Sequence, residues 1–249
     1  MSGPDEHQQV VFRPGIVDDA ESITHLFDAS RRDDATAMPL PVHPPETFLA
    51  FFSEILRGDA QVWVAESPVT ASVVGFVVLQ DDWVHSLYVH PQHTGHGVGS
   101  TLLDLAKVQR PAGLRLYVFE SNLRARAFYE RHGLVAVGRS DGTMNEEREP
   151  DLTMLWPGED AIAALRIAID ELDAQIARLL DLRAGVTAAI QGHKPVDQVQ
   201  GTHRDFQRER EIVERMGILA PRLGSKRLAV IMQAVIAQSL DASRAADLH

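Results

Sequence analysis

Residues 162–190 read IAALRIAIDELDAQIARLLDLRAGVTAAI, and the spacing of their apolar side chains decides the fold of the C-terminal part of the chain. Apolar residues recur at intervals of three and four, which places them on one face of an α-helix. Arg183 continues this row and Pro195 ends it, so the sequence predicts one helix of about 35 residues, roughly 50 Å long. A helix this long needs a partner helix along most of its length, and we expect a dimer. The aliphatic members of the row are Ile162, Leu165, Ile169, Leu172, Ile176, Leu179, Val186 and Ile190.

Cations interrupt and follow this apolar row. A guanidinium at position 183 requires an anionic partner, because an unpaired buried charge is very costly. Lys194 lies 11 residues after Arg183, close to three full turns, so both cations share a face about 16 Å apart with room for a small ligand. Arg166 lies roughly 100° round the helix from Arg183 and is expected to serve the pocket of the symmetry mate.

Two further helices are expected, near residues 204–216 and 225–243. Asp205, Arg208 and Glu209 are spaced i, i+3 and i+4 and cluster on one face of the first of them. Ordinary surface ion pairs, with Arg183 bridging a dimer, would also account for these charges.

The run LRIAIDELDAQIARLLDLR, then a lysine, then DFQRERE, resembles the all-helical AroQ class of chorismate mutases. The resemblance covers residues 160–243 and implies a dimer of three-helix chains with two pockets and no cofactor. Chorismate would rearrange to prephenate there without a covalent intermediate. The resemblance assigns roles as follows: Arg166 of the other subunit and Arg183 would pair with the two carboxylates, Lys194 would donate to the ether oxygen, Glu209 would accept from the ring hydroxyl, and Asp205 and Arg208 would complete the polar wall.

The third helix departs from this family pattern. Ser239 fits a family serine, whereas Ser243 stands where the family has Gln or Glu beside the ether oxygen. A serine is shorter, so low activity or another substrate, such as 4-amino-4-deoxychorismate, is an alternative. A pyruvate lyase on the same fold, or a helical part that serves only for dimerisation, are further alternatives.

The charge of the chain lies mainly in its first part. Residues 1–157 contain 12 Lys and Arg against 22 Asp and Glu, whereas residues 158–249 contain 12 against 13. This surplus favours solubility or attraction of a cationic substrate such as an amine, and argues against nucleic acid. The sequence has no cysteine, no signal-peptide pattern and no run of about 18 apolar residues, so we expect a cytoplasmic protein that does not span a membrane.

Strand-like and helix-like runs alternate through the first 157 residues, which predicts an α/β or α+β domain. The break at Pro157-Gly158 divides the chain into predicted domains 1–157 and 158–249. Strands are expected at 10–13, 62–66, 73–80, 84–89, 114–119 and 152–156, and helices at 19–30, 45–56, 99–109 and 123–132.

A glycine-rich turn follows the strand at 84–89. Gly95, Gly97 and Gly99 let backbone N–H groups converge on a phosphate at a helix N-terminus. The spacing matches neither a P-loop nor a dinucleotide fingerprint. One strand later comes Asn122-Leu-Arg-Ala-Arg-Ala-Phe-Tyr-Glu-Arg-His-Gly-Leu134.

Together these two segments resemble the acetyl-CoA motifs of GNAT acetyltransferases, over about residues 8–157. The resemblance implies an α+β domain with a mixed, mostly antiparallel sheet, acting on an unidentified amine. Tyr129 would protonate the departing thiolate, Asn122 would contact the pantetheine arm or its helix, and Leu87 and Val89 would hold the arm through their backbone. The turn that cradles the pyrophosphate comprises Thr94, Gly95, His96, Gly97, Val98, Gly99 and Ser100, where Thr94 replaces the usual Arg or Gln.

Other chemistry in this domain is less defined by the sequence. Asp82, His85 and Glu120 are candidates for the general base, which a water chain could replace. The three histidines of an HxxHxxH pattern, His90, His93 and His96, fall across a strand end and the turn. They should not converge, and no metal site is expected. A CoA-binding domain that only regulates the mutase is an alternative to an acetyltransferase.

Overall fold

The computed structural model describes residues 10–33, 37–193 and 206–246. Contacts divide the chain into two compact units, 1–169 and 170–249, each with its own fold. This division falls inside a helix, 12 residues beyond the expected break at Pro157-Gly158, and the domain boundary at 157/158 stays a prediction. Within the described ranges, no helix combines the length and the apolar character needed to cross a bilayer.

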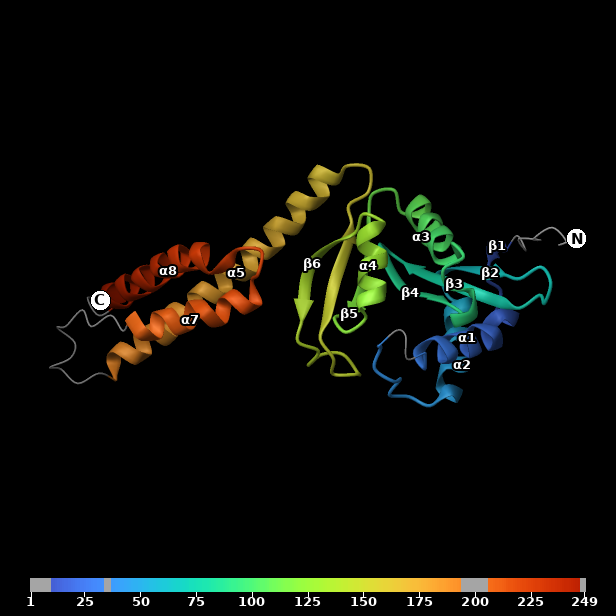
Figure 1. The fold of residues 1–249 in the computed structure, drawn as a ribbon, viewed down its shortest axis with the longest axis horizontal. Coiled ribbons are helices and arrows are strands. Elements are labelled where there is room, and N and C mark those ends of the chain that lie inside the picture. Colours follow the sequence, from blue (N-terminus) through green and yellow to red (C-terminus); the bar gives the residue numbers. More distant parts are fainter. Residues whose placement is uncertain (1–9, 34–36, 194–205, 247–249) are drawn as a thin grey trace, which may run out of the picture. The chain divides into compact units, whose positions relative to one another are not determined.

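The first unit is built on a seven-stranded sheet with the order β1-β2-β3-β4-β5-β7-β6. All neighbouring strands run antiparallel except β4 and β5, which are parallel. The prediction of a mixed, mostly antiparallel sheet is confirmed (Figure 1). The strands are β1 (Val11–Pro14), β2 (Gln61–Glu66), β3 (Val73–Gln80), β4 (Trp83–Val89), β5 (Leu114–Phe119), β6 (Val135–Ser140) and β7 (Asp151–Trp156).

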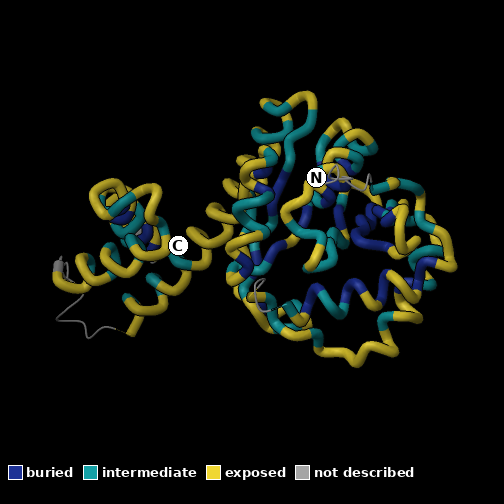
Figure 2. Tube along the Cα trace, turned by 45° about the vertical axis from the view of Figure 1, so that its right-hand side comes forward, coloured by how far each residue is buried: buried dark blue, intermediate teal, exposed yellow. Residues whose placement is uncertain are grey.

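Helices cover this sheet on two sides, and each side has its own apolar core (Figure 2). One core joins α3 and α4 to the sheet and includes Leu102, Leu116 and Tyr129. The other joins α1 and α2 to the sheet and includes Ile23 and Phe52. The helical segments of this unit are η1 (Val17–Asp19), α1 (Ala20–Arg31), α2 (Pro45–Arg57), η3 (Pro91–His93), α3 (Val98–Gln109) and α4 (Leu123–Arg131).

An arginine in β1 ties the edge of the sheet to the first helix. The Arg13 guanidinium donates to both carboxylate oxygens of Asp19, at 2.7 and 2.8 Å, and to Glu66 of β2 at 2.7 Å. Asp19 also accepts from the backbone N–H of Ile16 at 2.8 Å. Paired geometry of this kind offsets the cost of burying the Asp19 carboxylate.

The two parallel strands separate almost at once. Their register contains a single pair, Trp83 with Arg115, and beyond it β4 pairs only with β3. The sheet therefore opens between β4 and β5 toward the end of β4, where Leu87 and Val89 lie.

The second unit holds the helices α5 (Ala161–Gly192), α7 (Phe206–Leu219) and α8 (Gly224–Ala246), of which α5 begins in the first unit. α7 and α8 pack against each other. The 32 residues of α5 confirm the long helix, and at 1.5 Å per residue it is about 48 Å long. Residues 171–180 are exposed throughout, including Ile176 and Leu179.

Strand β6 was not expected from the sequence. Its residues, VAVGRS, contain Gly138, and the pairing with β7 is irregular between Ala136 and Gly138. A glycine and a bulge disturb the alternation on which strand prediction depends.

Candidate active sites

The glycine-rich turn that precedes α3 has an accessible backbone. Gly95 and Gly97 have φ values of +82° and +86°, and a Cβ added at either would meet nothing within 4 Å. Gly97 is the N-cap of α3 and Thr101 N–H donates to its carbonyl. The positive φ values favour glycine, and the open space leaves N–H groups at a helix N-terminus accessible to an anion.

Side chains of the same turn have structural contacts. Thr94 Oγ1 donates to Pro91 O at 2.9 Å, and Val98 is buried under the sheet. Ser100 Oγ lies 3.1 Å from His132 Nε2, which ties α3 to the end of α4. His96 is exposed. Any anion held here would therefore be bound mainly by the backbone.

The opening between β4 and β5 exposes backbone groups of β4. His90 N–H donates to Val74 O at 2.9 Å. Polar groups alternate in an antiparallel ladder, so Leu87 and Val89 direct theirs away from β3 toward β5. The carbonyl of Val89 accepts from Ser30 Oγ at 3.1 Å. An extended amide-containing group could pair with the remaining N–H and C=O groups as an added strand does.

Tyr129 of α4 is buried, with 8% of its surface exposed. Burial raises the pKa of its phenol, and the nearby Tyr88 hydroxyl raises it further. The hydroxyl therefore remains protonated well above neutral pH and is suited to donate a proton.

Asn122 caps the helix that carries Tyr129. Its side chain accepts from Ala125 N–H at 3.0 Å, and the residue is 7% exposed. The structure shows a contact of Asn122 with its own helix, and the contact with a pantetheine arm that the resemblance implies stays a prediction.

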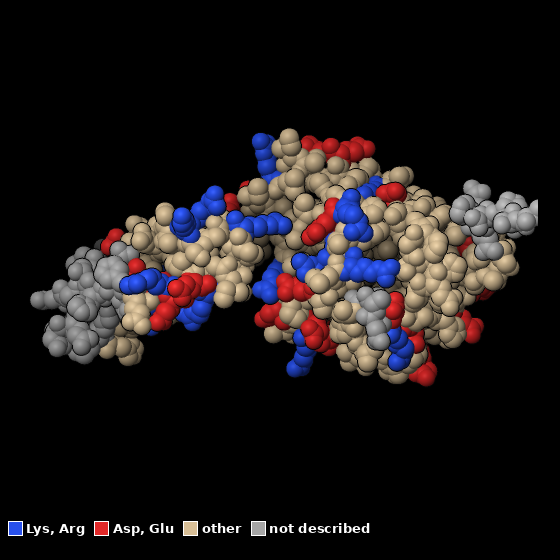
Figure 3. Space-filling view, in the orientation of Figure 1, with Lys and Arg blue, Asp and Glu red and all other residues tan. Residues whose placement is uncertain are grey.

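Basic side chains gather on the face where α4 lies (Figure 3). α4 contributes Arg124, Arg126 and Arg131. A Cβ at Gly99 of α3 would lie 3.6 Å from Phe128 of α4, so the glycine turn and this helix are neighbours. Within an acidic domain, this local surplus of cations favours a ligand with several phosphates.

The candidates for a general base differ in their surroundings. Glu120 is paired with Arg139 at 2.5 and 3.0 Å, and this contact lowers the pKa of its carboxyl. Asp82 lies 4.0 Å from Arg115, and His85 is exposed on β4. A carboxylate held by an arginine is a weak base, so Glu120 is the least suited of the three.

Two of the three histidines near the turn are neighbours. The ring centroids of His90 and His93 lie 6.0 Å apart, and His90 Nδ1 accepts from Gln92 N–H at 3.3 Å. Burial lowers the pKa of His93, and the nearby His90 and His96 lower it further. In the part of the chain that the structure describes, no group of three or more metal-binding side chains is arranged to hold an ion.

In the second unit, the arginine of the apolar row meets the third helix. Arg183 Nη1 donates to Ser239 Oγ at 2.7 Å and lies 3.4 Å from Val235 O. Ser239 Oγ in turn donates to Val235 O at 2.7 Å. Ser239 is 6% exposed, and its hydroxyl holds one nitrogen of the Arg183 guanidinium in place. The other N–H groups of the guanidinium are left for an anion.

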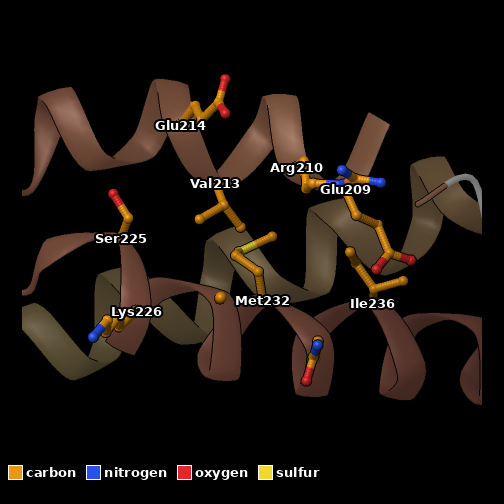
Figure 4. Close-up of a pocket in the computed structure, with 10 residues that line it drawn as sticks. Glu209, Arg210, Val213, Glu214, Ser225, Lys226, Met232 and Ile236 are labelled. Atoms are coloured by element: carbon orange, nitrogen blue, oxygen red, sulfur yellow. The ribbon is translucent and has the colours of Figure 1, made fainter. Parts of the chain in front are cut away.

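Glu209 lines a groove between α7 and α8. Figure 4 shows its side chain extending from α7 toward Ile236 of α8, whereas Glu214 points away from Met232. Ile236 and Ser239 are three residues apart on α8, so they share a face. The structure therefore brings the predicted residues Glu209, Arg183 and Ser239 to one face of α8.

Ser243 lies one further turn along that face, but its hydroxyl is turned back. Its Oγ donates to Leu240 O at 2.7 Å, and the residue is 4% exposed. A side chain engaged with its own helix does not present a donor to a ligand.

The remaining predicted residues of this site are placed as follows. Arg166 is exposed on α5, and Arg208 lies on α7. Lys194 and Asp205 lie outside the described residues.

A charged cluster that the sequence does not indicate lies on the α1 side of the sheet, where Arg31 interacts with Tyr88 and Glu147. Arg31 Nη2 donates to Glu147 Oε1 at 2.7 Å, although the two residues are 116 positions apart. In the sequence, Arg31 has the ordinary position of a cation in the last turn of a helix, and Glu147 belongs to a charged loop. No local signal joins them.

Comparison with known proteins places both units. Residues 58–134 match the acetyltransferase (GNAT) domain family, and residues 165–244 match chorismate mutase type II. Peptidyl-lysine N-acetyltransferase YjaB of Salmonella typhimurium is 31% identical over 99 residues, 40% of this chain and 67% of that protein. The Escherichia coli K12 protein of that name is 34% identical over 83 residues, 33% of this chain and 55% of its own length. The crystal structure of a GCN5-related N-acetyltransferase from Rhodopseudomonas palustris is 27% identical, with a TM-score of 0.50, and covers 62% of this chain and 99% of that one.

Proposed function

Because the chain belongs to the GNAT acetyltransferases through its first domain and carries a type II chorismate mutase domain after it, we propose that it is a bifunctional enzyme. The first domain transfers an acetyl group from acetyl-CoA to an amine. The second rearranges chorismate to prephenate. The cytoplasmic location expected from the sequence stays a prediction.

The residues of the first domain fit acetyl-CoA. The open backbone of Gly95 and Gly97 suits a pyrophosphate, and the gap between β4 and β5 suits the amide groups of a pantetheine arm. Leu87 and Val89 would hold that arm through their backbone. Acetyl-CoA supplies an activated acyl carbon and a thiolate leaving group.

Tyr129 carries the proton transfer in this proposal. The acceptor amine loses a proton to solvent and bonds to the acetyl carbon while the carbon–sulfur bond breaks. The phenol of Tyr129 gives its proton to the departing sulfur and recovers one from water. A phenol with a raised pKa is protonated at the start of each turnover.

The acceptor of the acetyl group is a primary amine in this proposal. The acidic surplus of residues 1–157 favours the approach of a cation. The relatives named above are peptidyl-lysine N-acetyltransferases, and a lysine side chain is one acceptor of this class.

The mutase proposal is carried by one observation, the contact of Arg183 with Ser239. It holds a cation on the face of α8 toward which Glu209 extends. Arg183 would bind one carboxylate of chorismate, Lys194 would donate to the ether oxygen, and Glu209 would accept from the ring hydroxyl. Fixed charges that match the rearranging conformer lower the barrier.

We propose that two chains form the complete mutase. Ile176, Leu179 and Leu182 of α5 are between 53% and 66% exposed in the single chain. A contiguous apolar helix face of this length is characteristic of an interface. Arg166, exposed on the same helix, would then bind the second carboxylate in the pocket of the partner chain.

Ser243 favours a second candidate for this domain. Because its hydroxyl bonds to Leu240 O, the ether oxygen would have one donor fewer. A substrate with another polar group, such as 4-amino-4-deoxychorismate, or a pyruvate lyase reaction is the alternative.

Two assays test the assignments separately. Prephenate formation from chorismate, run beside conversion of 4-amino-4-deoxychorismate, tests the mutase, and Arg183→Ala should abolish turnover while the dimer persists. Near-normal turnover of Arg183→Ala would exclude the proposed site. Calorimetric titration of acetyl-CoA tests the first domain, and a mutase rate that responds to acetyl-CoA without acetyl transfer would favour a regulatory domain.

A further inference from the structure

The last turn of α1 buries a guanidinium among aromatic rings. Arg31 is 6% exposed, and its guanidinium carbon lies 5.7 Å from the ring centroid of Phe27 and 5.6 Å from that of Phe119. Rings at these distances favour a cation but provide no counter-charge. A buried cation needs an anion.

The carboxylate that pairs with Arg31 belongs to a loop that is distant in the sequence. Glu147, between β6 and β7, accepts from Arg31 Nη2 at 2.7 Å, and the same nitrogen donates to Pro39 O at 2.8 Å. A second pair, His43 with Glu146 at 3.1 Å, joins the same two loops, the α1–α2 loop and the β6–β7 loop. In Figure 1 these loops lie beside each other.

This ion pair does not use the whole guanidinium fork. Among the described residues, Arg31 Nε has no hydrogen-bonding partner, although it is fully enclosed. A buried donor without a partner costs free energy, and a carboxylate is the group that fits the edge of a guanidinium. A carboxylate that reached this nitrogen would satisfy it.

On the same side of the sheet, the buried carboxylate of Asp151 has an oxygen that lacks a hydrogen-bond donor in the described part of the chain. Asp151 begins β7 and lies directly across from Phe119 of β5. Side chains at directly opposite positions lie on the same face, so Asp151 shares with Phe119 the face that Arg31 covers. Its Oδ2 accepts from Asn145 Nδ2 at 2.8 Å, while its Oδ1 is enclosed and has no partner within the described ranges. An ammonium group would satisfy that oxygen.

Tyr88 connects this cluster to the proposed acid of the transfer. Its ring is half-buried on β4, and its centroid lies 5.0 Å from that of Phe27. Burial raises the pKa of the Tyr88 hydroxyl, while the charge and hydrogen bond of Arg31 act in the opposite direction. Tyr88 is also near enough to Tyr129 to raise the pKa of that phenol. Tyr88 therefore interacts electrostatically with both Arg31 and Tyr129.

We propose that the acceptor of the acetyltransferase domain is a small amine that also carries a carboxylate, bound by Arg31 through the carboxylate and by Asp151 through the ammonium group. The inference rests on the proposed acetyltransferase function and deepens it. Arg31 and Asp151 flank Phe119 with opposite charge, which matches a zwitterion better than the single positive charge of a lysine side chain.

The test compares matched acceptors with the full-length chain. The free amino acids are supplied one at a time, each beside its carboxamide and beside a peptide with an internal lysine, and CoA release is measured. We expect at least one amino acid whose kcat/KM exceeds that of its carboxamide roughly 10- to 100-fold, because the neutral carboxamide cannot form an ion pair with the guanidinium.

Two variants assign the effect to residues. Arg31→Met should remove the difference in kcat/KM between the amino acid and its carboxamide, and Arg31→Lys should restore part of that difference. Arg32→Met is the matched control, since Arg32 is the next residue and pairs with Asp28 on the surface. Asp151→Asn should raise KM for both acceptors, with Asp104→Asn, an exposed position on α3, as its control.

The outcomes separate this inference from the proposed function. Equal rates with acid and carboxamide, acetylation of the lysine peptide alone, or no acetylated amino acid despite calorimetric binding of acetyl-CoA would each overturn the zwitterion site while leaving CoA binding intact. Failure of the wild-type chain to bind acetyl-CoA would overturn the acetyltransferase assignment, and the inference with it.

Discussion

Arg183 and Ser239 are 56 residues apart and joined by a hydrogen bond of 2.7 Å, and the serine hydroxyl in turn donates a hydrogen bond to Val235 O. Ser239 thereby orients a cation that the apolar row of α5 would otherwise leave unsupported. We predict that Ser239→Ala raises KM for chorismate roughly tenfold, the loss of one hydrogen bond to a charged group. Steady-state prephenate formation measures it, and an unchanged KM would show that Ser239 does not position Arg183.

Ser243 offers a gain of function. Ser243→Gln would extend an amide beyond Leu240 toward the ether oxygen, and we expect kcat for chorismate to rise about tenfold through one added donor. Ser243→Ala is the control and should leave kcat unchanged, because the native hydroxyl bonds to its own helix. If the glutamine lowers kcat instead, the pocket is adapted to another substrate.

Tyr129→Phe should lower kcat for acetyl transfer roughly 100-fold, the size of a lost general acid, with little change in acetyl-CoA affinity. Because the pKa of Tyr129 is raised, the wild-type rate should not fall through tyrosine ionisation near pH 10, the ordinary value. A pH profile of kcat and a calorimetric titration measure the two effects. Equal losses in kcat and affinity would indicate a packing role for the ring.

Asp19→Asn should lower the free energy of unfolding by about 2 kcal/mol at neutral pH, since Arg13 loses one of its two charged partners and keeps only Glu66. Burial raises the pKa of Asp19, but hydrogen bonds from Arg13 and Ile16 outweigh it and leave the pKa below its ordinary value. The stabilisation is therefore present above the unfolded-state pKa of about 4 and is lost as the pH falls through the lower folded-state value. Urea unfolding from pH 7 to pH 3 should show wild type and variant converging, while Asp18→Asn, an exposed neighbour, stays like wild type.

Leu179→Glu should dissociate the proposed dimer and abolish mutase turnover, because Arg166 would no longer reach a partner's pocket. Leu179 is 65% exposed in the single chain, so the substitution costs little within it. Sedimentation velocity measures the mass. Val108→Glu, an equally exposed position on α3, should leave the mass unchanged, and a monomeric wild-type chain would refute the arrangement.

Local sequence patterns were sufficient for most elements of this fold. The Val-rich run of β3 is buried, and the apolar row of α5 follows the helical repeat. Both elements lie within a few residues of their predicted bounds. β6 was missed because Gly138 breaks its alternation. The pairings of β2 with β3 and of β3 with β4 are irregular as well, but these strands are rich in β-branched and aromatic residues and were still recognised.

The sites were predictable only in part. The glycine turn follows from neighbouring residues, and the structure shows its positive φ values and its open backbone. The cluster around Arg31 depends on a partner 116 positions away, and the direction of the Ser243 hydroxyl depends on a rotamer choice. Neither the pairing of Arg31 nor the direction of the Ser243 hydroxyl can be predicted from the local composition of the sequence.

Because the register between β4 and β5 contains only the pair Trp83 and Arg115, the sheet consists of two hydrogen-bonded blocks, β1–β4 and β5–β7. The β4–β5 pairing is confined to this one position, so local opening should begin along this boundary at a free energy below that of global unfolding. A cofactor arm inserted there would act as a missing strand and couple the two blocks. Hydrogen exchange of the Leu87 and Val89 amides would then become slower when the cofactor arm binds. Binding would also make the whole sheet unfold as one cooperative unit.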